Sequence, residues 1–242
     1  MKKLGAGKLW KYIFWQVDVP YFHKIEDSTH LDLGSGSKPR NPFFAKRVVA
    51  LDLELNNVDQ PTNAKHLTLV NHNLSEPLPF LDNSIDSVSA FDLLEHIIRV
   101  ENVGKVVTYP FINLMDEIYR VLKPDGYFIS LTPSFPSPQA FEHPTHINFI
   151  SKGTLSYFCG EGSEVLRAYG FKGKYQLIHE HWQVGAGPFE DPKNLVLNRL
   201  SNCSSREKIL GLTRILWRFF KLIRRGLFIR SHRLCVLQKV GF

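Results

Sequence analysis

The sequence predicts an α/β domain with a mainly parallel sheet and helices packed on its faces. Apolar runs rich in β-branched residues alternate along the chain with segments of helical periodicity, which is the pattern of such a sheet. The length of 242 residues suits one packed domain and is short for two. Apolar residues make up 43% of the chain, enough for a sizeable core.

The expected elements follow from this pattern. Residues 109–122 are expected to form a helix, which Lys123–Gly126 ends. A second helix is expected over 151–170, broken near Gly160–Gly162. The expected strands are 28–34, 47–53, 66–70, 85–91, 127–131, 173–184 and 232–240. In a parallel sheet of this kind the ligand binds at the carboxyl ends of the strands.

Cysteine usage and hydropathy favour a cytoplasmic protein. The chain has an odd number of cysteines, and they lie far apart in the sequence, at Cys159, Cys203 and Cys235. This does not fit a disulfide framework and favours a reducing compartment. No apolar run reaches the length of a membrane-spanning helix. Residues 1–27 lack the pattern of a signal peptide and are expected to form a helical extension of a single domain spanning 1–242.

The net charge of +7 is concentrated in one late segment. Residues 206–230 hold eight Lys/Arg and one Glu, so they carry +7, whereas residues 28–205 hold fifteen Lys/Arg and nineteen Asp/Glu, so they carry −4. The body of the protein is therefore mildly acidic, and nucleic acid is not an expected partner.

A glycine-rich turn follows the first expected strand. The apolar run at 28–34 leads directly into Gly34-Ser35-Gly36, where glycine lets the backbone turn and approach a ligand closely. Asp52 ends the next strand, where an acid can bind ribose hydroxyls. No third glycine follows where a dinucleotide pyrophosphate would need it. The pattern therefore favours an adenosine ligand without phosphates.

Five segments in this order resemble the class I S-adenosylmethionine (SAM)-dependent methyltransferases, and the resemblance covers roughly residues 28–184. These segments are Asp32-x-Gly34-x-Gly36, Leu78-Pro79-Phe80, Ser84–Val88, Leu94-Glu95-His96-Ile97 and Tyr119–Gly126. A further segment, Phe141–Phe149, more loosely resembles the subset found among bacterial surface-polysaccharide and ubiquinone-type enzymes. Asp125 stands where the family has the first glycine of its "LKPGG" turn.

The resemblance implies a Rossmann-like sheet of seven strands with helices on both faces and an antiparallel last strand. It implies SAM as cofactor, with Asp52 on the ribose; a helix N-cap is the other interpretation of Asp52. Asn73 stands where the family often has an adenine-binding Asp, and is otherwise an ordinary loop residue. The cofactor-binding residues that it implies are Asp32, Gly34, Ser35, Gly36, Asp52, Leu53, Asn73, Leu74 and Phe91.

Asp92, Glu95 and His96 are spaced to share one helical face just after the fourth strand, and the loop carrying His146 can return to the same edge. Histidine can act as a general base on an acceptor hydroxyl, so His146, His96 and Glu95 are the candidate catalytic residues. Hydrogen bonding between loops is one alternative. A cation site is the other, because the small-RNA 2′-O-methyltransferases have a similar carboxylate-x-x-Glu-His and a later His. Asp92 would replace their first Glu, and two histidines and two carboxylates could hold the cation. His143 is a weaker candidate than His146.

Residues 188–230 are expected to be a basic amphipathic helical insertion before the last strand. Within 206–225, apolar residues share one face and Arg214, Arg218, Lys221 and Arg225 line the other. Bulky apolar residues opposite cations suit peripheral contact with an anionic membrane. A helix packed on the sheet and, less favoured, a nucleic-acid contact are the alternatives.

The expected reaction is transfer of the SAM methyl group to an oxygen of a glycan or lipid-linked glycan, in polysaccharide biosynthesis. A small-molecule hydroxyl, as in quinone-type methyltransferases, is the second expectation. A SAM-binding module without turnover is the third, and it belongs to a different class of protein. The sequence does not determine the oligomeric state.

Overall fold

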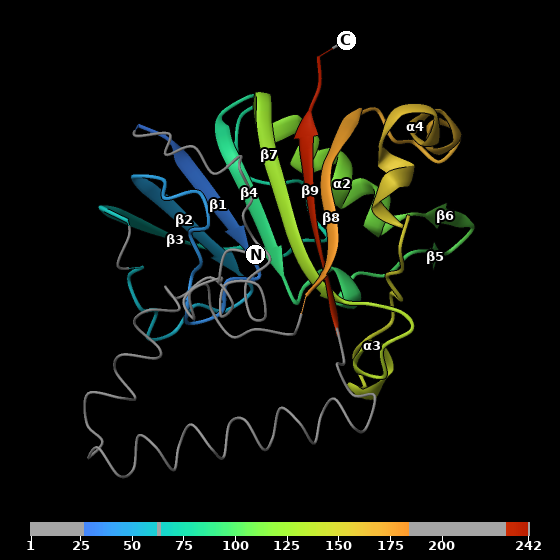
Figure 1. Ribbon diagram of the computed structural model, residues 1–242, viewed down its shortest axis with the longest axis horizontal. Coiled ribbons are helices and arrows are strands. Elements are labelled where there is room, and N and C mark those ends of the chain that lie inside the picture. The colour runs from blue at the N-terminus through green and yellow to red at the C-terminus, as the bar shows by residue number, and fades with distance from the viewer. Residues whose placement is uncertain (1–26, 62–63, 184–230, 242) are drawn as a thin grey trace, which may run out of the picture.

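The computed structural model describes residues 27–61, 64–183 and 231–241. Within these residues lies a seven-stranded sheet in the order β3-β2-β1-β4-β7-β9-β8 (Figure 1). A separate antiparallel pair, β5 (Glu101–Val103) and β6 (Val106–Thr108), was not expected from the sequence. The seven strands are β1 (Thr29–Leu33), β2 (Arg47–Asp52), β3 (His66–Asn71), β4 (Ile85–Phe91), β7 (Leu122–Pro133), β8 (Tyr175–Gln183) and β9 (His232–Lys239).

The Rossmann-like α/β fold is confirmed. Neighbours from β3 through β7 pair in parallel, whereas β9 pairs antiparallel with both β7 and β8. The strands expected from the sequence are all present, and β7 is longer than expected because it continues through the turn that follows the preceding helix. Asp125 in that turn has φ +62°, which explains why the resemblance places a glycine there.

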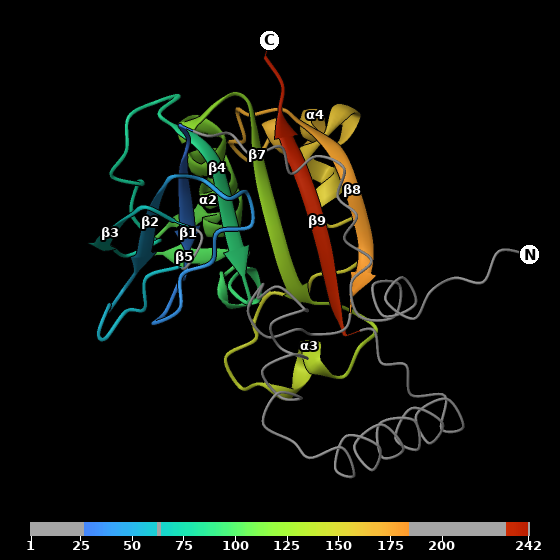
Figure 2. The same ribbon diagram turned by 60° about the vertical axis from the view of Figure 1, so that its left-hand side comes forward.

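The two longer helices of the described residues, α2 (Pro110–Val121) and α4 (Gly160–Arg167), pack on the same face of the sheet (Figures 1 and 2). The helix expected over 109–122 is confirmed. The second expected helix is shorter than predicted, because the 3₁₀ turn η2 (Leu155–Phe158) precedes α4. The short α3 (Gln139–Glu142) lies beyond the carboxyl end of β7.

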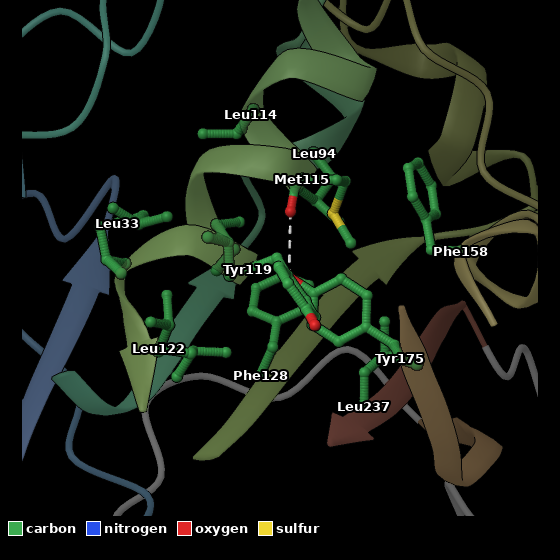
Figure 3. Packing of buried hydrophobic residues seen from close by; sticks show 14 of the residues in the cluster. Leu33, Leu94, Leu114, Met115, Tyr119, Leu122, Phe128, Phe158, Tyr175 and Leu237 are labelled. Atoms are coloured by element: carbon green, nitrogen blue, oxygen red, sulfur yellow. Dashed lines mark hydrogen bonds between the residues drawn. The ribbon is translucent and has the colours of Figure 1, made fainter. Parts of the chain in front are cut away.

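The main core lies between α2 and the sheet (Figure 3). Met115 and Ile118 of α2 are fully buried against Phe128 of β7 and Tyr175 of β8. The Tyr175 hydroxyl donates to the Met115 carbonyl over 3.0 Å, so this large buried ring keeps its polar atom satisfied. A core of this size fixes β7 and β8 against α2, and so fixes where their carboxyl ends lie.

The opposite face of the sheet carries a smaller apolar cluster. Phe43, from the connection between β1 and β2, packs there with Phe91, Ile129, Leu131 and Leu234. The described part of that connection contains no helix, although the chain crosses from one parallel strand to the next. The loop therefore covers this part of the sheet with a single buried phenyl ring.

A chain of buried polar groups joins β1 to β4. The Ser89 hydroxyl donates to Asp32 Oδ1, so its oxygen is free to accept from His30 Nε2 at 2.8 Å. His30 Nδ1 then accepts from the Ser87 hydroxyl, also at 2.8 Å. All four residues are buried, and their bonds link strands at the centre of the sheet.

Two expected segments lie outside the described residues: the N-terminal extension over 1–27, apart from Asp27, and the basic insertion over 188–230. In the described part of the chain, no helix has the length and apolar character needed to cross a bilayer.

Burial lowers the pKa of the His30 imidazole to about 3, so we expect a change of this side chain to alter how stability depends on pH. An unfolded histidine takes up a proton near pH 6.5, so acid favours the unfolded chain between these two values. His30→Gln should be less stable than wild type near pH 7. That deficit should narrow below pH 6.5 by up to about 1.4 kcal/mol per pH unit, as measured by urea unfolding.

His66→Gln is the matched control, because His66 is exposed at the start of β3. Its unfolding free energy should stay parallel to that of wild type at every pH. Parallel curves for His30→Gln as well would contradict the assignment of a buried neutral imidazole.

Candidate active site

The glycine turn is folded tightly against the end of β2. The amides of Gly34 and Ser35 both donate to the Leu51 carbonyl, at 2.8 and 3.2 Å. Gly34 has φ +63°, and a Cβ there would lie 2.9 Å from Leu93 Cδ1. Glycine is therefore required at this position by both backbone conformation and space.

The Asp32 carboxylate makes its hydrogen bonds inside the protein. It is fully buried, with Oδ2 accepting the Arg40 amide at 2.7 Å and Oδ1 accepting the Ser89 hydroxyl. Burial raises its pKa to about 6, an effect that these hydrogen bonds oppose. Because both oxygens are engaged within the protein, Asp32 is positioned to hold the loop that follows Gly36.

Asp52 lies directly beside the glycine turn, as the sequence predicts for a ribose-binding acid. Its Oδ2 accepts the Gly36 amide at 2.9 Å, and its Oδ1 accepts the Leu53 amide at 2.7 Å. Each carboxylate oxygen has a second lone pair available for a ligand hydroxyl. The neighbouring Leu53 is 69% exposed, so an apolar side chain faces solvent at the rim.

The remaining expected cofactor residues lie at the same edge in different environments. Asn73 is exposed, and its Oδ1 accepts a hydrogen bond from the Ser75 amide at 3.0 Å. The side-chain NH₂ of Asn73 does not take part in this hydrogen bond. Leu74 is partly buried against the main core. Phe91 is 2% exposed and lies under the Arg40 guanidinium, at 5.1 Å.

His72 is a residue that the sequence did not single out. Its amide donates to the Asp52 carbonyl at 2.8 Å, so it lies at the rim of the same cradle. Its Nε2 is buried without a hydrogen-bond partner among the described residues. Histidine directly after a strand has no distinctive sequence signal, which is why only the structure finds it.

These residues fit an adenosine-containing cofactor. Gly36 has φ +55°, and a Cβ built on it would meet no atom within 4 Å among the described residues, so the backbone borders open space. The Asp52 carboxylate lies at that opening, held by the Gly36 amide. Acceptor oxygens beside a side-chain-free turn can bind ribose hydroxyls while the turn follows the rest of the ligand.

The segment after β4 differs from the expected helical face. It forms only a three-residue 3₁₀ turn, η1 (Leu94–His96), and Asp92 before it has φ +51°, outside the helical region. Asp92 Oδ1 instead lies 3.1 Å from His232 Nε2, at the start of β9. The prediction that Asp92 shares a helical face with Glu95 and His96 is therefore wrong, because a distant strand pairs with its carboxylate.

Glu95 carries a buried carboxylate with unmet hydrogen-bonding capacity. It is 1% exposed, and neither oxygen has a hydrogen-bond partner among the described residues. The nearest cationic candidate is His146, whose Nε2 lies 3.9 Å from Glu95 Oε1. Burial, and secondarily the Asp92 carboxylate, raises the pKa of Glu95 to about 8.

The structure brings His96 and His146 to the same place. Their ring centroids lie 4.9 Å apart at 74°, and His143 lies 5.9 Å from His96. Burial lowers the pKa of His96, although a hydrogen bond to Thr145 opposes the shift. One ligand atom from each of Glu95, His96 and His146 lies within 4.8 Å of the others, so this group could hold a metal ion.

The loop after α3 is bound to η1 by its backbone. The amides of Ile147 and Asn148 both donate to the Glu95 carbonyl at 2.9 Å. Asn148 also donates from Nδ2 to the Leu94 carbonyl at 2.9 Å and accepts from Arg99 Nε. Buried Asn148 was not expected from the sequence, and it fixes the distance between the His146 loop and Glu95.

A hollow of about 660 Å³ lies beside this loop, among η2, α4 and the start of α2. Its lining combines Arg99 and Lys152 with Tyr109, Tyr157 and Tyr169. The hollow does not include the glycine turn or Asp52. Arg99 belongs to both the hollow and the Asn148 contact, so it connects the hollow to the loop that binds η1. Glu95, His96 and His146 are not among the residues that line the hollow.

Residues 31–130 match the family model of a methyltransferase domain. Among solved structures the chain is similar to one from a complex between the Haloferax volcanii Trm112 methyltransferase activator and a putative methyltransferase (14% identity, TM-score 0.49, 98% of this chain and 95% of that one). It is also similar to a SAM-dependent methyltransferase from Archaeoglobus fulgidus (17%, 0.47, 96% and 92%). None of the curated proteins matches this chain.

The match covers the strands that build the glycine turn, the Asp52 cradle and η1. Together with the seven-stranded sheet and its antiparallel strand β9, this match supports a methyltransferase with a Rossmann-like fold. More particularly, the protein is a SAM-dependent enzyme, and S-adenosyl-L-methionine is its cofactor.

Gly36→Ala should weaken SAM binding severely. The added methyl group would project into the open space beside Asp52, and the positive φ adds a strain of about 1 kcal/mol. We expect micromolar binding in wild type and at least roughly tenfold weaker binding in the variant, since each factor of ten is about 1.4 kcal/mol. Isothermal titration calorimetry with SAM measures both.

Gly104→Ala is the matched control. Gly104 has φ +65° and equally open surroundings, but it lies in the turn between β5 and β6. Both variants should lose similar thermal stability, and only Gly36→Ala should lose SAM affinity. Equal affinities in the two variants would place the cofactor elsewhere.

Proposed function

We propose that this enzyme methylates a hydroxyl oxygen of a glycan or lipid-linked glycan in polysaccharide biosynthesis. The observation that carries this proposal is the hollow lined by three tyrosines, Arg99 and Lys152, whose Arg99 also contacts Asn148 in the loop after His146. Aromatic faces pack on sugar rings, whereas cations and backbone groups can bind hydroxyl or anionic substituents. A polar, ring-containing acceptor therefore fits this lining.

Bound SAM supplies an electrophilic methyl group on a sulfonium centre. The glycine turn and Asp52 would hold the adenosine and methionine parts, with Asn73 and Leu74 at the adenine side. Leu93 packs within 2.9 Å of the Gly34 Cβ position, so the cofactor turn and η1 are in direct contact. This contact would bring an acceptor at Glu95 close to the methyl group, where proximity and orientation supply much of the rate.

We assign the acceptor-activating role to His146, assisted by His96 and Glu95. His146 is bound through Nδ1 to the Gln139 carbonyl at 3.1 Å, so its ring orientation is fixed. Its side chain is 9% exposed, and His96 lies beside it. These groups would position the acceptor hydroxyl and make its oxygen more nucleophilic at the moment of transfer.

A small-molecule hydroxyl of the quinone type is the second candidate acceptor. The apolar part of the hollow, which includes Phe111, Ile112 and Phe158, favours it. Labelled SAM offered in parallel to bacterial glycan, lipid-linked glycan and quinone-precursor fractions distinguishes the candidates. Label in a methyl ether of a sugar supports the first, and label confined to the quinone precursor would rule it out.

His146→Ala should lower kcat for the methylated fraction by roughly a hundredfold or more, a typical contribution for a group that activates an acceptor. SAM affinity should stay within about twofold, because the cradle is built from other strands. His66→Ala, at an exposed position in β3, serves as the control and should keep wild-type turnover. Normal turnover in His146→Ala would mean that the ring only supports its loop.

We further propose that residues 206–225 bring the enzyme to the cytoplasmic face of an anionic membrane, where a lipid-linked acceptor would be located. Each Lys or Arg near such a surface contributes about 1 kcal/mol, screened by salt over roughly 8 Å. The support is the sequence alone, where Arg214, Arg218, Lys221 and Arg225 line one side of an apolar helical pattern.

Replacing these four cations with Gln should abolish sedimentation with anionic vesicles at low salt, while SAM affinity stays unchanged. Wild-type protein should be released as the salt concentration rises. If wild type does not sediment with anionic vesicles at low salt, or if the variant sediments equally well, the membrane proposal is wrong.

A further inference from the structure

The hollow beside the loop after α3 carries positive charge that no described acid offsets. Arg99 and Lys152 are the charged side chains among its lining residues, which include no Asp or Glu. The ion pairs of the described residues all join other side chains. Two unpaired cations that face one hollow create a field that attracts an anion.

Arg99 is held in one orientation by its own loop contacts. Its Nε donates to Asn148 Oδ1, and its Nη2 donates to the Phe149 carbonyl at 2.7 Å. Its Nη1 forms no hydrogen bond with the described residues. Burial lowers the pKa of this guanidinium, which stays charged at neutral pH. The end of the guanidinium away from Nε can therefore bind the oxygens of a carboxylate or a phosphate.

Three tyrosines form much of the wall of the hollow. Tyr109 and Tyr169 meet edge to face, with ring centroids 5.2 Å apart at 81°, and Tyr157 and Tyr169 are each about half exposed. The hydroxyls of these tyrosines form no hydrogen bond with the described residues. A ring with an open face and an unbonded hydroxyl suits a sugar, which presents both C–H faces and hydroxyl groups.

Exposed phenyl rings continue from the hollow toward the carboxyl edge of the sheet. Phe149 lines the hollow and packs on Phe141 of α3, with ring centroids 4.7 Å apart. Phe141 in turn meets Phe135, which follows β7, at 6.3 Å. All three rings are about half exposed, and α3 lies beyond the carboxyl end of β7 (Figure 1). This aromatic track, Phe135, Phe141 and Phe149, is the kind of contiguous exposed apolar surface that marks a binding site.

We propose that the hollow binds a negatively charged sugar of the acceptor, with its carboxylate or phosphate at Arg99 and Lys152. The tyrosines would contact the ring of that sugar, and neighbouring sugars would lie along the aromatic track toward the site of methyl transfer. This inference rests on the proposed function for the statement that the acceptor is a glycan. Binding of a charged sugar in the hollow does not depend on methyl transfer.

The two cations are the part of the lining that discriminates between glycans. Tyrosine rings and hydroxyls can contact a neutral sugar as readily as a charged one. Hydrogen bonds between ionised groups are roughly twice as strong as those between neutral groups. Because both cations are exposed to solvent, we expect the preference for a charged sugar to weaken as the salt concentration rises.

A matched pair of sugars tests the role of charge in the full-length protein. Tetragalacturonic acid and its methyl ester have the same rings, but the ester carries no charge. Calorimetry at low salt should show that wild type binds the acid at least roughly tenfold more tightly than the ester, a difference of about 1.4 kcal/mol. Glucose 6-phosphate and glucose repeat the comparison for a phosphate. A preference for either charged sugar supports the inference and identifies the anionic group.

Lys152→Gln and Arg99→Gln should each remove most of the preference for the acid and leave the affinity for the ester within about twofold. The Lys152 side chain makes no hydrogen bond with the described residues, so its replacement is informative even if Arg99→Gln disturbs the Asn148 loop. Lys105→Gln is the matched control, an exposed lysine between β5 and β6 that does not line the hollow. SAM affinity shows that each variant is folded.

Three results would overturn the charged-sugar site. The first is equal affinity of wild type for each charged sugar and its neutral counterpart, or binding of none of them. The second is a preference for the acid that persists in folded Lys152→Gln and Arg99→Gln. The third is binding of anionic phospholipid vesicles through these two cations without binding of any charged sugar, which would assign the hollow to a membrane surface.

Phe141→Ala tests the aromatic track separately. Wild type should bind tetragalacturonic acid more tightly than the galacturonic acid monomer, because the longer chain reaches the track. The variant should lose this advantage and keep its preference for the acid over the ester. Leu81→Ala, at another exposed apolar position, should behave as wild type. An unchanged advantage of the tetramer in Phe141→Ala would overturn the track.

Activity separates this inference from the proposed function. Methyl transfer to an acidic glycan fraction, with KM raised and kcat kept in Lys152→Gln, supports both. Transfer to neutral glycans alone would overturn the charged-sugar site and leave the proposed function intact. Binding of a charged sugar in the hollow without transfer to any glycan fraction would overturn the proposed acceptor and leave the binding site intact.

Discussion

The buried carboxylate of Asp32 is the interaction on which the cofactor half of the molecule depends. It receives the Arg40 amide on one oxygen and the Ser89 hydroxyl on the other, so it joins the loop after the glycine turn to the neighbouring strand β4. Ser89 in turn accepts from His30, which completes a polar chain across two central strands. Each member is satisfied, and such networks fix one arrangement of a core.

An apolar contact joins the two halves of the site. Gly34 has no Cβ, and the Leu93 side chain occupies the space beside it, so the turn after β1 and the turn after β4 pack directly together. A larger residue at Gly34 would move both the cofactor cradle and η1. The relative position of the cofactor turn and η1 is therefore set by packing as well as by hydrogen bonds.

Much of the fold could be predicted from the sequence because it is encoded in local periodicity. The buried positions of β2 and the apolar face of α2 are regular enough to place both elements. The hairpin of β5 and β6 escaped prediction, since exposed Val103, Val106 and Val107 show no buried alternation. It is held by its own ladder and contributes no residue to the main core.

The site could be predicted only as far as residue type and strand order determine it. Asp52 and the glycine turn lie together because adjacent parallel strands end at one edge. The partner of Asp92 could not be predicted, since His232 is 140 positions away and lies on a strand inserted between β7 and β8. Asn148 gave no signal either, because its importance comes from two tertiary contacts.

Asp32 and Glu95 show how burial alone does not determine the role of a carboxylate. Both are nearly inaccessible, and burial raises the pKa of each. Around Asp32 the fold directs a backbone amide and a hydroxyl at the side chain itself. Around Glu95 it directs the amides of Ile147 and Asn148 at the main-chain carbonyl. The hydrogen-bonding capacity of the first carboxylate is therefore met within the protein, whereas neither oxygen of the second has a partner among the described residues.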